Sequence, residues 1–150
     1  MPKDIRRAAQ DELPAVLDLI QRQFAYMDDR IDPPSSMYRL TVEGLTQTDV
    51  WVAGDPICAC MVLTPVSDHL HLGKVAIEPA YRGQGLLEEL VNRAEDVARE
   101  LRLNTIQLES RIELKEVHRA FAKVGFQEVR TGAHDGYAKD TFIVMEKAVG

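Results

Sequence analysis

The chain has 150 residues, 45% of them hydrophobic and 28% charged, which is enough for a single domain over residues 1–150 with a sizeable core. Its net charge of −6 lacks the basic surplus that favours nucleic acid or an anionic membrane surface, so we expect neither as a partner. No apolar run approaches a membrane span and the N-terminus lacks the apolar stretch of a signal peptide, so we expect a cytoplasmic protein.

The predicted elements alternate between strands and helices. Apolar residues at helical spacing predict helices over 11–24, 85–102 and 113–124, with a short further helix over 41–47. Short apolar or alternating runs predict strands over 3–8, 49–54, 57–65, 69–77, 105–109, 126–132 and 141–147, with a hairpin turn at 54–56. The strand 105–109 lies between two helices and should pair in parallel with a neighbour. This order predicts an α/β fold with a mixed central sheet of six to seven strands and helices on both faces.

The two cysteines, Cys58 and Cys60, lie two residues apart in an apolar run. On a strand they would share one face of the sheet, too constrained to bridge each other comfortably. The sequence has no second pair of cysteines for a zinc site. We therefore interpret both as small core residues and expect no metal.

A glycine-containing turn follows the predicted strand 69–77. In AIEPAYRGQGLLEELVNRAEDVARE (76–100), Arg82, Gly83 and Gly85 precede a long helical pattern. Free amides at a helix N-terminus favour an anion, glycines let the backbone approach it, and arginine adds a positive charge. The turn therefore predicts a phosphate or pyrophosphate site, although a plain strand-to-helix turn could use the same glycines. It lacks the lysine and hydroxyl of a Walker loop, and Glu88 stands where a dinucleotide fingerprint needs a third glycine.

The segment VAIEPAYRGQGLLEELVNRAEDVARELRL (75–103) resembles the coenzyme-A-binding motif of the GNAT superfamily of N-acetyltransferases. The family pattern is Gln/Arg-x-x-Gly-x-Gly/Ala; Arg82 and Gly85 match it, and Leu87 departs from it. The segment HRAFAKVGFQEV (118–129) resembles the second family motif, a short helix ending in Gly-Phe before a strand. The order of elements is also similar to the GNAT-like acyl-CoA N-acyltransferase fold across nearly the whole chain.

The resemblance implies an enzyme that transfers an acetyl group from acetyl-CoA to a primary amine of a small molecule or peptide, by direct attack on the thioester. The pantetheine arm would lie along Val75, Ala76 and Ile77 and pair with the backbone of Val75 and Ile77. The Val75 amide would polarise the thioester carbonyl. Gly73 is expected to mark a bulge that re-aims this strand. Family members are often dimers, so a homodimer is possible. The pyrophosphate would bind the backbone of the loop residues Arg82, Gly83, Gln84, Gly85, Leu86 and Leu87.

Attack on the thioester needs a base for the acceptor ammonium and an acid for the leaving thiolate. His71 lies six residues before Ile77, a position that resembles the site of the base in histone-type members, and an imidazole suits the task. The alternative is a surface histidine, and Glu109 is a second candidate base. The usual acid is a tyrosine at the position of Phe121, which has no proton to donate and reads as a core or cofactor-facing residue. Tyr137 is a candidate acid, with a solvated turn residue as the alternative.

The acceptor is expected near FAYMDDRIDPPSSMYRL (24–40), because the substrate of this fold usually lies beside the first helices. Tyr26 would offer an apolar wall and Asp28, Asp29 and Asp32 would attract a cationic amine; the alternative is a proline-stiffened surface loop with solvated acids. The departures from the family pattern also allow a second function, a non-catalytic coenzyme-A-binding sensor or partner module.

Overall fold

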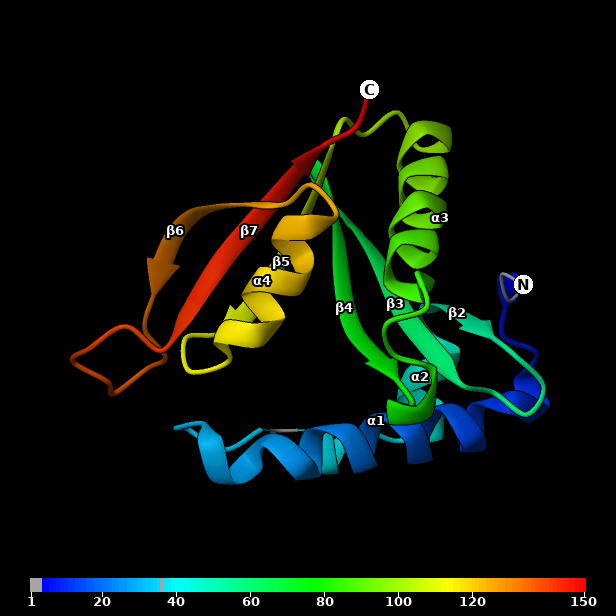
Figure 1. Cartoon of the computed structure of the whole chain (residues 1–150), viewed down its shortest axis with the longest axis horizontal. Helices are drawn as coiled ribbons and strands as arrows, with labels where there is room; N and C mark the ends of the chain where they lie inside the picture. The colour runs from blue at the N-terminus through cyan, green and yellow to red at the C-terminus, as the bar shows by residue number, and fades with distance from the viewer. Residues whose placement is uncertain (1–3, 36) are drawn as a thin grey trace.

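A computed structural model describes residues 4–35 and 37–150, and in it one mixed sheet carries helices on both faces (Figure 1). The strands are β1 (Ile5–Arg7), β2 (Asp49–Ala53), β3 (Ala59–Val66), β4 (His69–Ile77), β5 (Thr105–Arg111), β6 (Gln127–Gly132) and β7 (Phe142–Ala148). The α-helices are α1 (Leu13–Met27), α2 (Val42–Thr46), α3 (Leu86–Glu100) and α4 (Lys115–Lys123). The sheet has the order β1-β2-β3-β4-β5-β7-β6. Among the described strands, only β4 and β5 pair in parallel, as predicted.

Each face of the sheet has its own core because each helix presents one apolar stripe. In α3 the buried residues Leu90, Ala94 and Val97 recur every three or four positions, and they pack in one core with Phe121 of α4. The helices α1 and α2 supply a second core, which includes Val16, Ile20 and Leu45. We call these the α3 core and the α1 core. The prediction of helices on both faces is confirmed.

A bulge re-aims β4. The pairs Cys60–Ala76 and Val62–Gly73 show that β4 has one more residue than β3 between them. Lys74, inside the bulge, has a φ of 50°, which side chains rarely adopt. The predicted bulge beside Gly73 is therefore present. The bulge changes which positions of β4 face the α3 core. Before it these are the even-numbered Leu70 and Leu72, and after it they are the odd-numbered Val75 and Ile77.

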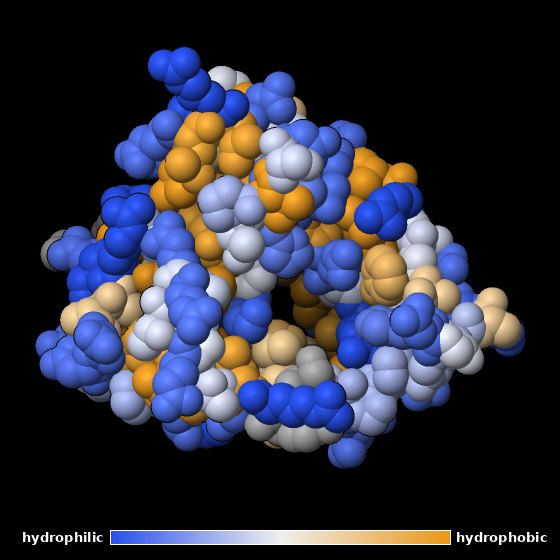
Figure 2. All heavy atoms as spheres, turned by 180° about the vertical axis from the view of Figure 1, so that it is seen from behind, coloured by the Kyte–Doolittle hydropathy of each residue, from blue (hydrophilic) through white to orange (hydrophobic). Residues whose placement is uncertain are grey.

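The strands β4 and β5 separate soon after they meet. Their registered pairs are Leu70–Ile106 and His71–Gln107, at the start of both strands. Beyond these pairs the strands spread apart toward α1 (Figure 1). Seen from behind the view of Figure 1, the surface of the molecule has a hollow near its middle, and hydrophobic residues lie deep in it (Figure 2). Residues 72–77 of β4 therefore pair with β3 alone, and we call their other side the open edge of β4.

The prediction that the two cysteines share a face is wrong. β3 begins at Ala59, so Cys58 lies in the turn that follows β2 and donates its amide to the Ala53 carbonyl at 2.9 Å. Cys58 consequently belongs to the α3 core, whereas Cys60 belongs to the α1 core. Both are buried and neither forms a disulfide, as expected of core residues.

The other predicted elements are present with ends displaced by up to three residues, and residue 3 of the first predicted strand lies outside the described residues. The hairpin at 54–56 joins β2 to β3. Within residues 4–35 and 37–150, no helix is both long and apolar enough to cross a membrane.

Candidate active site

The glycine turn presents an unobstructed backbone. A short 3-10 helix (Pro79–Tyr81) leads into it, and Gly83 and Gly85 adopt φ values of 75° and 79° before α3 begins at Leu86. A β-carbon added to either glycine would meet no atom within 4 Å. Only glycine adopts this conformation without strain, and the space above both residues is open to a ligand.

The amides of this turn have no backbone acceptor among the described residues. Glu89 donates to the Gly85 carbonyl at 3.2 Å, which begins the hydrogen bonding of α3. In the described part of the chain, no backbone carbonyl accepts from the amides of Gly83 through Glu88. These donors lie at the positive end of the α3 dipole, which is the arrangement that binds a phosphate or pyrophosphate.

The side chain of the arginine in the turn makes structural contacts. The Arg82 guanidinium donates to the Ile77 carbonyl at 3.3 Å and to the side chain of Gln23 on α1, and its amide donates to Pro79 at 3.3 Å. Arg82 therefore ties the turn to β4 and α1, and its amide is not among the free donors. Leu87 is the residue that departs from the family pattern, and its side chain packs against the α3 core. Its backbone amide therefore stays at the turn.

The predicted pairing residues of β4 face its open edge. The Glu78 amide donates to the Cys58 carbonyl at 2.8 Å, so the backbone amide of Glu78 points toward β3. Backbone groups alternate along a strand, and the groups of Val75 and Ile77 therefore point away from β3. The Ile77 carbonyl is used by Arg82. The remaining groups at this edge are available to a ligand that lies as an added strand.

His71 lies at the last pair before the strands separate. Its imidazole is partly buried, and burial lowers its pKa below 6.5, with the nearby Glu109 carboxylate acting in the opposite direction. The side chain is therefore mostly neutral at neutral pH and can accept a proton. Its neighbour His69 contacts Asp68, with 2.8 Å between Nδ1 and Oδ1. Glu109 is exposed on β5.

The acidic loop after α1 is docked against the other half of the sheet. Arg30 pairs with Glu116 at the start of α4, with 2.8 Å between Nη2 and Oε1. The Asp32 amide donates to Glu113 at 3.2 Å, and Arg111 donates to the Pro33 carbonyl. Sequence reasoning missed Arg111, Glu113 and Glu116, because their partners lie about eighty residues away along the chain and no local pattern marks them.

The predicted acceptor residues have mixed surroundings. Asp28 accepts the Ser35 amide at 3.1 Å and shapes the loop. Asp32 accepts the Tyr137 hydroxyl at 2.7 Å, and this hydrogen bond raises the Tyr137 pKa above 10. Asp29 is exposed on the loop surface. Tyr26 is 75% exposed, and its contribution to an apolar wall for the acceptor stays a prediction.

The sequence of residues 13–126, most of the chain, matches the profile of the acetyltransferase (GNAT) family. The chain belongs to the GNAT family. The predicted resemblance is confirmed, and the protein is an N-acetyltransferase by family. None of the curated proteins matches it in sequence.

Solved GNAT structures share its fold. PaiA N-acetyltransferase from Thermoplasma acidophilum, in complex with coenzyme A, has a TM-score of 0.79 at 15% identity and covers 99% of both chains. The ribosomal-protein-S18-alanine N-acetyltransferase from Escherichia coli has a TM-score of 0.67 at 20% identity, covering 99% of this chain and 94% of that one. A spermidine N-acetyltransferase SpeG chimera from Vibrio cholerae and hSSAT has a TM-score of 0.73 at 17% identity, covering 99% and 96%.

Phe121, at the position where the GNAT pattern has a proton-donating tyrosine, is a core residue here. It is 7% exposed, and its ring packs edge-on against Phe126 with centroids 5.4 Å apart. The pair lies in the α3 core together with Leu108 of β5. A contact between Phe121 and the cofactor stays a prediction.

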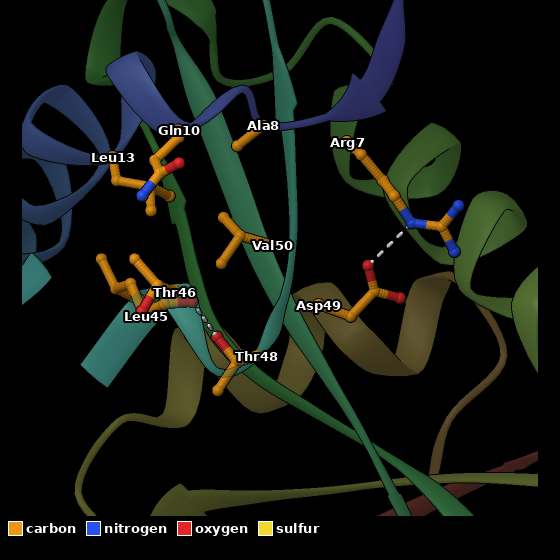
Figure 3. Close-up of a pocket in the computed structure, with 9 residues that line it drawn as sticks. All are labelled: Arg7, Ala8, Gln10, Leu13, Leu45, Thr46, Thr48, Asp49 and Val50. Atoms are coloured by element: carbon orange, nitrogen blue, oxygen red, sulfur yellow. Dashed lines mark hydrogen bonds and ion pairs between the residues drawn. The ribbon is translucent and has the colours of Figure 1, made fainter. Parts of the chain in front are cut away.

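A separate pocket of about 270 Å³ lies beside β1 and β2 (Figure 3). At its rim Arg7 is paired with Asp49 at 3.0 Å, and the side chains of Leu13, Leu45 and Val50 supply its apolar part. None of the residues predicted for the active site lines it. It also lacks a free acid or base, so we place the GNAT chemistry at the open edge of β4 instead.

Proposed function

We propose that this GNAT enzyme transfers the acetyl group of acetyl-CoA to a primary amine of a small molecule or peptide. One observation carries the proposal. The open edge of β4 leads to a turn in which the amides of Gly83 through Glu88 have no backbone acceptor among the described residues. An extended arm with a pyrophosphate at one end fits this arrangement, with the arm along Val75 and Ile77. The coenzyme A complex of the related PaiA fold supports the same ligand.

Bound acetyl-CoA supplies an activated acetyl group as a thioester. The Val75 amide donates to the carbonyl oxygen of that thioester as the oxygen gains negative charge. His71 takes a proton from the acceptor ammonium, which frees the nitrogen lone pair to form the new C–N bond while the C–S bond breaks. Glu109 is the rival base. The leaving thiolate takes its proton from Tyr137 or from water, because Phe121 has none to give.

The acceptor amine is proposed to approach past the loop after α1, where its positive charge is attracted by Asp28, Asp29 and Asp32. By their names, one related protein acts on an alanine of ribosomal protein S18 and another on spermidine. Both substrates are amines, so the loop rather than the sheet is expected to select between them. A cytoplasmic location and a homodimer stay predictions.

Thermal unfolding with acetyl-CoA, free coenzyme A and phosphate tests the proposal. A ligand at about a hundred times its Kd adds roughly 2.7 kcal/mol, which raises the Tm of a domain of this size by about 5–10 °C. We expect a rise with acetyl-CoA and coenzyme A but not with phosphate. No rise at millimolar acetyl-CoA would refute the assignment of the turn. Binding without turnover across a panel of amines would instead favour the non-catalytic sensor.

A further inference from the structure

The side chain of Cys60 spans the bulge of β4. Its thiol donates to the Lys74 carbonyl, with 3.6 Å between sulfur and oxygen. The Ala76 amide also lies within hydrogen-bonding reach of the sulfur. Cys60 is fully buried in the α1 core, directly opposite Ala76 in the β3–β4 pairing. One side chain of β3 therefore contacts the backbone on both sides of Val75.

The thiol is a hydrogen-bond donor under ordinary conditions. Burial raises the pKa of Cys60 to about 12, and the Ala76 amide offsets only part of this effect. The thiolate is therefore negligible at neutral pH. A protonated thiol can donate to a carbonyl, whereas an alanine or valine at this position could not.

Peptide geometry connects this hydrogen bond to the open edge of β4. The carbonyl of Lys74 and the amide of Val75 belong to one planar, trans peptide, so they point in opposite directions. Because the Lys74 carbonyl is directed at Cys60 on the β3 side, the Val75 amide is directed away from β3. Alternation along the strand gives the same direction independently, since the Glu78 amide points to β3.

This peptide needs a restraint. It lies in a bulge, where the regular ladder between β3 and β4 is interrupted, and Lys74 holds a φ of 50°. A residue in this sparsely populated conformation persists only when its surroundings hold it. Among the described residues, the side chain that donates a hydrogen bond to the Lys74 carbonyl is the Cys60 thiol.

We propose that the Cys60 thiol is a positioning residue, which orients the Lys74–Val75 peptide so that the Val75 amide points at the thioester carbonyl. This inference rests on the proposed function, because it assumes that acetyl-CoA lies along β4. Cys60 touches neither substrate. Its effect is to keep the oxyanion-stabilising donor in place before the reaction begins.

The test compares Cys60→Ala, which removes the donor, with Cys60→Ser, which keeps a hydroxyl donor at the same site. Cys60→Val is a second donor-free variant that fills the volume, for use if the alanine variant does not fold. Cys58→Ala is the matched control, because Cys58 is an equally buried cysteine in the opposite core.

The readout that is independent of turnover is the ¹³C shift of bound acetyl-CoA labelled at the acetyl carbonyl, measured without an acceptor. In the wild-type protein and in Cys58→Ala we expect the carbonyl to move downfield from its position in free acetyl-CoA. In Cys60→Ala or Cys60→Val it should return toward the free value, and in Cys60→Ser the downfield shift should reappear. The turnover number should fall about fivefold in the donor-free variants, because they lose the effect of one weak hydrogen bond. The Kd for acetyl-CoA should be unchanged.

The outcomes separate the two proposals. A downfield shift that persists at full size in folded Cys60→Ala or Cys60→Val would overturn the role of Cys60 and leave the proposed function intact. A bound carbonyl at the free position in the wild-type protein would remove the role of the Val75 amide, and the inference about Cys60 with it. Absence of binding would refute the proposed function itself.

Discussion

The imidazole of His71 lies over Gly73, so that a β-carbon on Gly73 would come 3.2 Å from Nε2 of the ring. Both residues lie on the face of β4 toward α1, two positions apart and just before the bulge. The ring thus occupies the space that any other residue at position 73 would need. Glycine at this position therefore leaves room for the candidate base.

Gly73→Ala is expected to displace the His71 ring by a few tenths of an ångström. Because proton transfer depends on the position of the base, the turnover number should fall about tenfold while the Kd for acetyl-CoA changes less than about twofold. Steady-state kinetics and a binding titration measure the two effects. Gly44→Ala is the control, since an added β-carbon there meets its nearest atom at an ordinary 3.5 Å. Wild-type turnover in Gly73→Ala would show that the ring does not need this space.

The pH dependence of turnover should report the titration of His71. Burial lowers its pKa below 6.5, and only the neutral ring accepts a proton, so kcat/KM should rise with pH through a value below 6.5 and then level off. His71→Gln should lower the plateau by about a hundredfold or more and remove this rise. Glu109→Gln is the comparison. If the rise disappears in Glu109→Gln and persists in His71→Gln, the base is Glu109.

Gly85→Glu is expected to abolish acetyl-CoA binding, because it places a carboxylate where the pyrophosphate should lie. Part of any effect will come from backbone strain, since Gly85 has a φ of 79°. Gly136→Glu controls for this strain: Gly136 has a φ of 85°, also has no atom within 4 Å of an added β-carbon, and lies in the loop between β6 and β7. The thermal shift with acetyl-CoA should vanish in the first variant and persist in the second. An unchanged affinity in Gly85→Glu would exclude the turn as the phosphate site.

Phe121→Ala should destabilise the protein whether or not a cofactor is present. Removing a buried ring from a packed core costs about 3–5 kcal/mol, which lowers the Tm by roughly 10 °C or more in a domain of this size. Thermal unfolding of the ligand-free protein measures this loss. A normal Tm without ligand, combined with weaker acetyl-CoA binding, would mean that Phe121 faces the cofactor rather than the core.

The sequence by itself determined the features that depend on near neighbours along the chain. The turn at Gly83 and Gly85 and the helical stripe that follows it arise from conformational preferences over a few residues. The order of such elements was also enough to predict a parallel pair in a mixed sheet, because a strand that follows a crossover helix returns in the same direction.

Only the tertiary structure decided which distant groups meet. Arg82 has the charge expected at a phosphate turn, yet its guanidinium contacts Gln23, which is 59 residues away. The loop at Asp32 docks on Glu113 and Tyr137, and Cys60 reaches the Lys74 carbonyl across the β3–β4 pair. Such contacts depend on the register and separation of strands, which are set by the packing of whole cores, and no spacing within one segment records them.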